Sequence, residues 1–131
     1  MENYPELLSL AKKASENSYS PYSKFSVGAA VLFESGNIYT GCNVENASYG
    51  LTLCAERNAI STAVSAGEKS KIKAIAIYSP QQTKCMPCGA CRQWLSEFAA
   101  DKTKIILEDD NLSPLILNLD EVFPFSFKFE K

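Results

Sequence analysis

Two short segments of this chain contain the residue types that bind a metal ion and use it in chemistry. They are Cys54-Ala55-Glu56-Arg57 and Pro87-Cys88-Gly89-Ala90-Cys91. Cys88 and Cys91 are three residues apart, so in a helical turn their sulfurs lie on one side and can share a metal ion. Cys54 can supply a third thiolate from the other segment. Three protein ligands leave one open position on a tetrahedral Zn²⁺, which is typical of a catalytic zinc site.

Alternative interpretations of the cysteines stay open at this point. Cys85 lies three residues before Cys88. As a fourth ligand it would close the site and make it structural, and the protein would then be a zinc module without activity. The pair Cys88-x-x-Cys91 at a helix start also fits thiol redox chemistry. Cys42 is expected to be a small buried residue at the end of a strand.

The first segment also contains an acid and a base next to the cysteine, Glu56 and Arg57. At a helix start Cys54 can reach the metal ion while Glu56 lines the pocket. An apolar pocket raises the pKa of a carboxyl group toward neutrality, which suits a group that takes up and returns protons. The alternative is a solvated carboxylate in the first helical turn, where the helix dipole favours acids. Arg57 follows Cys54 by one turn, and its charge would offset the net negative charge of three thiolates on Zn²⁺.

These residues need a scaffold that brings both segments to one place. Helices are expected at 5–17, 54–66 and 88–100, a strand hairpin at 27–33 and 38–42, further strands at 73–79, 104–108 and 115–118, and a helical turn at 119–123. This order predicts a three-layer α/β/α sandwich with a mixed five-stranded sheet, largely parallel, to which the hairpin adds an antiparallel edge. Helix starts that follow strands gather at one end of such a sheet, where ligands bind.

Composition narrows the classes of protein. The 131 residues are 46% hydrophobic, an ordinary globular balance, and their number fits one domain over residues 1–131. The chain contains no histidine, which excludes Ser-His-Asp and Cys-His hydrolases and every histidine-bound metal site. Five cysteines without an export signal indicate metal binding or thiol chemistry, and not a disulfide framework.

Charge and hydropathy exclude two kinds of partner. The formal net charge is −2 and no basic stripe is visible, which argues against binding to nucleic acid. No apolar run approaches the roughly 20 residues that a membrane span needs, so no membrane partner is expected. The first residues lack both the basic and the apolar segment of a secretory signal, and a cytoplasmic location is therefore expected.

In combination, the two cysteine segments resemble those of the zinc-dependent cytidine deaminases of the small, homotetrameric type. The resemblance runs through about residues 20–127. Residues 22–30 look like the first strand of that family and the approach to it, and residues 41–49 look like its nucleoside loop. A zinc site of three cysteines with a glutamate that is not a ligand is a known signature of base deaminases.

The resemblance implies a complete reaction. One Zn²⁺ per subunit would be held by Cys54, Cys88 and Cys91, with Arg57 beside the ligands. Glu56 would take a proton from the attacking water and pass protons to cytosine N3 and to the departing ammonia. The products of cytidine and 2′-deoxycytidine would be uridine and 2′-deoxyuridine, as in pyrimidine salvage. The small nucleoside would be the main partner, together with further copies of the chain in a homotetramer.

The resemblance also implies contacts with the nucleoside. Phe25 would pack against the base, and the backbone N–H of Ala55 would donate to its C2 carbonyl. The side chains of Asn43 and Glu45 would hydrogen-bond the 3′-hydroxyl. At the subunit junction Tyr49 would contribute, and Phe127 would reach into a neighbouring subunit's site, with Phe125 as the alternative.

Two rival substrates belong to the same chemistry. Relatives that act on blasticidin S lack the Asn-x-Glu-Asn loop that residues 43–46 provide here. Deaminases of polynucleotides commonly use a histidine ligand, and they need a positively charged groove that follows the phosphate backbone. The composition of this chain therefore favours a free nucleoside.

Overall fold

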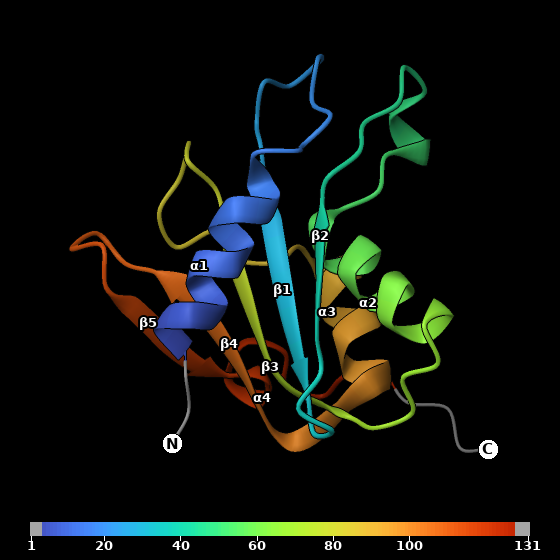
Figure 1. The fold of residues 1–131 in the computed structure, drawn as a ribbon, viewed down its shortest axis with the longest axis vertical. Coiled ribbons are helices and arrows are strands. Elements are labelled where there is room, and N and C mark those ends of the chain that lie inside the picture. Colours follow the sequence, from blue (N-terminus) through green and yellow to red (C-terminus); the bar gives the residue numbers. More distant parts are fainter. Residues whose placement is uncertain (1–3, 128–131) are drawn as a thin grey trace.

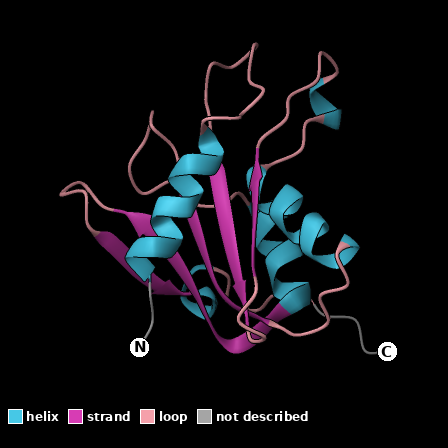
Figure 2. Cartoon of the chain, viewed as in Figure 1, coloured by secondary structure: helices cyan, strands magenta, loops and turns pink. Residues whose placement is uncertain are grey.

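The computed structural model describes residues 4–127 as a five-stranded sheet with helices on both faces (Figure 1). Four α-helices and one short 3₁₀ helix, η1, accompany the strands among the described residues (Figure 2). In chain order the elements are α1 (Tyr4–Ser15), β1 (Gly28–Phe33), β2 (Ile38–Cys42), η1 (Tyr49–Leu51), α2 (Ala55–Ser65), β3 (Ile72–Tyr78), α3 (Gly89–Phe98), β4 (Ala99–Glu108), β5 (Pro114–Asn118) and α4 (Leu119–Val122).

The sheet is mixed, as expected, but it is not largely parallel. Its strand order is β2-β1-β3-β4-β5, and only β3 and β4 pair in parallel. The expectation of a largely parallel sheet was wrong because β1 lies between β2 and β3 and is antiparallel to both. The chain from β2 through α2 to β3 therefore crosses over β1, and β4 and β5 form a second antiparallel pair.

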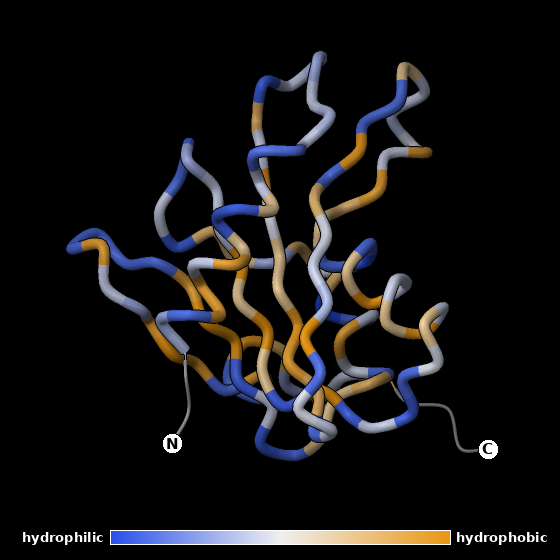
Figure 3. Tube along the Cα trace, viewed as in Figure 1, coloured by the Kyte–Doolittle hydropathy of each residue, from blue (hydrophilic) through white to orange (hydrophobic). Residues whose placement is uncertain are grey.

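Two apolar clusters on opposite faces of the sheet give the predicted three layers. Alternate residues of a strand point to opposite faces. On one face α1 packs its buried Leu7 and Ala11 against Ala30 and neighbouring strand residues. On the other face α2 and α3 cover the larger cluster, which contains Val31 and Ile75. The apolar residues concentrate along the central strands in Figure 3, and the connecting loops at one end are mostly polar.

Two glycines allow the helices to lie close to the sheet. A Cβ atom at Gly28 would lie 2.0 Å from the carbonyl oxygen of Ala11 in α1. A Cβ atom at Gly41 would lie 2.5 Å from the backbone nitrogen of Ala59 in α2. Neither contact is sterically possible, so glycine is required at both positions for this packing. Gly41 thereby sets the distance between β2 and the helix that carries Cys54.

Helix α3 ends earlier than the sequence predicts. The predicted helix over 88–100 includes Ala99 and Ala100, but the structure begins β4 at Ala99. Ala99 is extended and pairs with Ile72, and the backbone N–H of Ala100 donates to the hydroxyl of Thr103 at 2.8 Å. Alanine favours helices in isolation, so the tertiary pairing with β3 overrides the local preference.

Glu68 connects the β1–β2 turn to the segment after α2. One of its carboxylate oxygens accepts hydrogen bonds from Ser35 and Asn37, and the other accepts from the hydroxyl and the backbone N–H of Ser70. These bonds, that from the Ser70 hydroxyl first, lower the pKa of Glu68 to about 2. The carboxylate is therefore charged in the folded protein over almost the whole acidic range.

The lowered pKa predicts a pH-dependent effect of Glu68→Gln. A carboxyl group with a lower pKa in the folded state stabilises the fold above its ordinary pKa of 4.5, and this contribution disappears as the pH falls toward the folded value. The variant is expected to be less stable than the parent at neutral pH, with the difference shrinking toward about pH 3. Urea unfolding of both proteins checks this, because zinc loss in acid affects both alike. A difference that is constant or grows in acid would contradict the assigned role.

No helix among residues 4–127 is both long enough and apolar enough to cross a bilayer.

Candidate functional site

Three cysteine sulfurs meet where α2 and α3 begin. Cys54 is the N-cap of α2 and Cys88 is the N-cap of α3, both with extended backbone angles. Neither side chain caps its own helix, so both sulfurs are free to turn toward Cys91 in the first turn of α3. The Sγ atoms of Cys54, Cys88 and Cys91 all lie within 4.8 Å of one another.

The surroundings of the three sulfurs fit a zinc ion. Three sulfurs this close together can each reach a Zn²⁺ ion at a Zn–S distance of about 2.3 Å with modest adjustment. The pKa of Cys54 is lowered to about 5, first by a hydrogen bond from Cys91 and also by the guanidinium of Arg57. Arg57 Nη2 donates to Cys54 Sγ at 3.3 Å. The site therefore favours a thiolate, which is the form that binds metal.

Cys85 differs from these three in its environment. It lies outside the group of mutually close sulfurs found within residues 4–127. Burial raises the pKa of its thiol to about 11, and the charge of Glu56 adds to this shift. Because Cys85 lies outside the group of close sulfurs, the geometry favours three protein ligands over the closed site of four.

Glu56 is a buried carboxylate next to the sulfurs. Only 5% of it is exposed, and burial raises its pKa above the ordinary value for glutamate. It lies in the first turn of α2, two residues after Cys54. The alternative of a solvated carboxylate in this turn is therefore wrong. A raised pKa suits a carboxyl group that must both accept and donate a proton.

A pocket of about 430 Å³ opens beside the sulfurs and Glu56. Its size is in the range of small-molecule sites. Three loops that rise at the same end of the sheet supply most of its walls (Figure 1). The lining residues are Ser23, Phe25, Val27, Asn43, Glu45, Thr52, Cys54, Ala55, Glu56, Cys85, Met86 and Cys88.

Asn43 and Glu45 hold the loop that precedes β1. Asn43 Oδ1 accepts a bond from Val27 N–H at 3.0 Å and another from the Ser18 hydroxyl, and its Nδ2 donates to the Phe25 carbonyl at 2.8 Å. Glu45 accepts bonds from the backbone N–H groups of residues 22 and 23 and from the Ser23 hydroxyl. The Ser23 hydroxyl contributes most to lowering the pKa of Glu45, so this carboxylate is charged.

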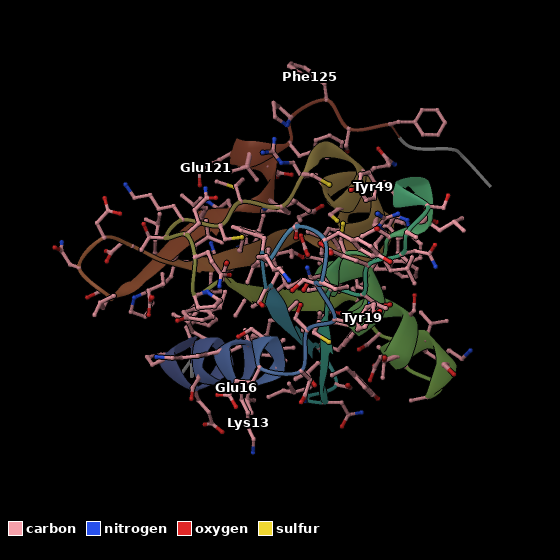
Figure 4. The ribbon with its side chains drawn as sticks, turned by 90° about the horizontal axis from the view of Figure 1, so that it is seen from above. Lys13, Glu16, Tyr19, Tyr49, Glu121 and Phe125 are labelled. Carbon is pink, nitrogen blue, oxygen red and sulfur yellow. The ribbon has the colours of Figure 1, made fainter. Side chains whose placement is uncertain are left out.

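The other predicted contact residues divide into two groups. Phe25 and Ala55 line the pocket of their own chain. Tyr49 and Phe127 do not line it and are largely exposed, at 74% and 70%. Tyr49 contacts Tyr22 edge-on with ring centres 6.1 Å apart, and the Phe127 carbonyl accepts a bond from Gln93. Phe125 is fully exposed and projects from the body of the chain in Figure 4.

Comparisons with known proteins agree with this geometry. A family model described as "Cytidine and deoxycytidylate deaminase zinc-binding region" matches residues 1–107. The chain belongs to this family. A curated cytidine deaminase of Halalkalibacterium halodurans is 41% identical over 124 residues, which are 95% of this chain and 93% of the relative. One of Sporosarcina psychrophila is 49% identical over 102 residues, or 78% and 74% of the two chains.

Solved structures of the same family share the fold. The crystal structure of cytidine deaminase from Burkholderia pseudomallei has a TM-score of 0.88 and 38% identity, covering 97% of this chain and 100% of the other. That from Mycobacterium tuberculosis has a TM-score of 0.85 and 38% identity, covering 98% and 100%. The predicted family, the α/β/α class and the zinc cofactor, one ion per chain, are confirmed.

Several residues of the site were not predicted. Ser23, Thr52 and Met86 line the pocket, and Gln81 holds its wall through a bond to Ser26. All four lie in loops, where hydropathy has no regular period that would indicate which side chains face the pocket. For Ser23 the only signal was its place in the stretch 22–30 that resembles the family.

Proposed function

We propose that this protein catalyses the hydrolytic deamination of cytidine and 2′-deoxycytidine to uridine and 2′-deoxyuridine with release of ammonia. The observation that carries the proposal is the meeting of three cysteine sulfurs with a buried carboxylate, Glu56, beside one pocket. The curated relatives bear the name cytidine deaminase, which directs the choice of substrate.

In this proposal the zinc ligands are Cys54, Cys88 and Cys91. Zinc with one open position supplies Lewis-acid chemistry that lowers the pKa of water. Three thiolates carry more negative charge than the ion balances. Arg57, which donates to Cys54 Sγ at 3.3 Å, and the N-termini of α2 and α3 offset part of the excess.

Glu56 moves the protons of the reaction. It accepts a proton from water as the oxygen attacks C4 of cytosine, and it delivers a proton to N3. The C4–N bond then breaks, and the leaving amine departs as ammonia with a proton that Glu56 has relayed. A carboxyl group whose pKa burial has raised above its ordinary value is suited to both directions of transfer.

The pocket walls orient the nucleoside. We infer that Phe25 packs against the base and that the backbone N–H of Ala55 binds its C2 carbonyl. Glu45, whose carboxylate is already held by residues 22 and 23, would accept a hydrogen bond from the 3′-hydroxyl. Asn43 has one N–H of its amide beyond the bond to Phe25 and would donate to the same oxygen. Polar groups that would be left unpaired disfavour ligands without the hydroxyl.

The test is incubation of the zinc-loaded protein with cytidine, 2′-deoxycytidine, free cytosine and a cytosine antibiotic, with and without a chelator. Chelator-sensitive ammonia release from the two nucleosides, with little from the other compounds, is the expected result. Activity on the antibiotic alone, or none on any of the four, would overturn the proposal.

We also infer that the chain assembles into a homotetramer. Tyr49, Leu51, Phe125 and Phe127 are each at least two-thirds exposed, and such apolar surface usually marks a contact. Phe127 lies outside the pocket of its own chain and would complete a neighbour's site, with Tyr49 at the junction.

Phe127→Ala tests the assembly and the site together. We expect a weaker tetramer or a higher KM for cytidine, measured by sedimentation and by initial rates, and the same measurements on Phe125→Ala test the alternative that Phe125 makes this contact. A monomeric parent protein with full activity would contradict the inference.

A further inference from the structure

The backbone of residues 25–27 is held largely by side chains from two other loops. These residues directly precede β1, and Phe25 and Val27 line the pocket. Asn43 behaves like a neighbouring strand, because its side-chain amide accepts from Val27 N–H and donates to the Phe25 carbonyl. The N–H between them, that of Ser26, donates to Gln81 Oε1 at 2.9 Å.

Gln81 comes from the loop after β3, 55 positions away in the sequence. Its own position is set by Ser79, whose hydroxyl accepts a bond from Gln81 N–H at 3.2 Å. Ser79 is only 5% exposed, so it anchors the start of this loop to the end of the sheet. The bond to Ser79 therefore holds Gln81 in a position from which its side-chain oxygen reaches the Ser26 N–H.

We propose that Gln81 is a positioning residue for nucleoside binding, which holds the Phe25–Val27 wall of the pocket through the Ser26 N–H. This inference rests on the proposed deamination of cytidine. Asn43 binds the carbonyl of the same peptide group, that of Phe25, and the N–H of the following one, that of Val27. The two side-chain amides together hold three successive residues.

The physical consequence concerns binding more than chemistry. Without the acceptor on Gln81, the Ser26 N–H bonds to water and the wall gains conformational freedom. A nucleoside must then order the wall as it binds, and that ordering costs affinity. The sulfurs and Glu56 belong to α2 and α3 and to their N-caps, which Gln81 does not contact through any of these bonds.

Gln81→Ala is expected to raise the KM for cytidine by about 2- to 10-fold, the usual worth of one hydrogen bond, with kcat nearly unchanged. Gln82→Ala is the matched control, because Gln82 is an exposed neighbour of the same type. Gln81→Glu is expected to restore the KM, since a carboxylate oxygen also accepts from Ser26 N–H. Asn43→Asp should not be tolerated in the same way, because its carboxylate would face the Phe25 carbonyl.

A second readout does not depend on activity. Amide hydrogen exchange at Ser26, followed by NMR in the zinc-loaded protein without substrate, is expected to be faster in Gln81→Ala and close to the parent in Gln81→Glu. If the parent fails to deaminate cytidine, the proposed function fails. If the parent is active but Gln81→Ala leaves both KM and Ser26 exchange unchanged, or lowers kcat instead of raising KM, the positioning role is wrong.

Discussion

Glu56→Gln is expected to lower kcat for cytidine by about 10²–10⁴-fold, the range that positioned acid–base groups contribute, while the protein keeps its zinc and its fold. Glutamine has nearly the shape of glutamate and fits the same buried place, where Glu56 is 5% exposed. It cannot accept the proton that water must lose. Initial rates of ammonia release, zinc content and thermal unfolding measure the three quantities on one preparation.

The control for this variant is Glu16→Gln. Glu16 is exposed just after α1 and lies on the opposite side of the sheet from Tyr49 and Phe125 (Figure 4). It is expected to leave kcat unchanged. Equal rates for Glu56→Gln and the parent would remove Glu56 from the mechanism, and zinc loss in Glu56→Gln would instead make it a group that supports the ligands.

Cys88→Ala is expected to lower zinc affinity by at least about 100-fold and to abolish deamination. Loss of a partner that only supports a ligand already costs about 10–100-fold in metal affinity, and Cys88 offers its sulfur directly within 4.8 Å of the other two. Because bound zinc stabilises the folded state, the variant should also have a lower Tm, and a chelator should lower the Tm of the parent but not that of the variant.

Cys85→Ala decides between a site with three protein ligands and one with four. Cys85 keeps a neutral thiol with a raised pKa outside the group of sulfurs, so this variant should retain one zinc per chain. Cys42→Ala, at the end of β2, controls for the general effect of removing a half-buried thiol. Zinc retained in Cys88→Ala and lost in Cys85→Ala would reassign the ligands.

Local sequence was enough to predict the parts of the site that depend on one stretch of chain. Cys88 and Cys91 fall on one side of a turn because a helix repeats every 3.6 residues. Gly67, with a φ of +93°, follows α2 where a glycine is expected after a helix. The apolar runs of β1 and β3 indicated strands, and the change from strand to helix before Cys54 and Cys88 placed both at helix starts.

What depends on contacts between distant segments was decided only by the tertiary structure. The position of β1 between β2 and β3 depends on which strands pair across distant segments, and the expectation of a largely parallel sheet did not include it. Likewise, Gln81 reaches Ser26 across 55 positions through a single hydrogen bond between loops. Periodicity records only burial along one element, whereas such bonds depend on how separate elements are placed in space.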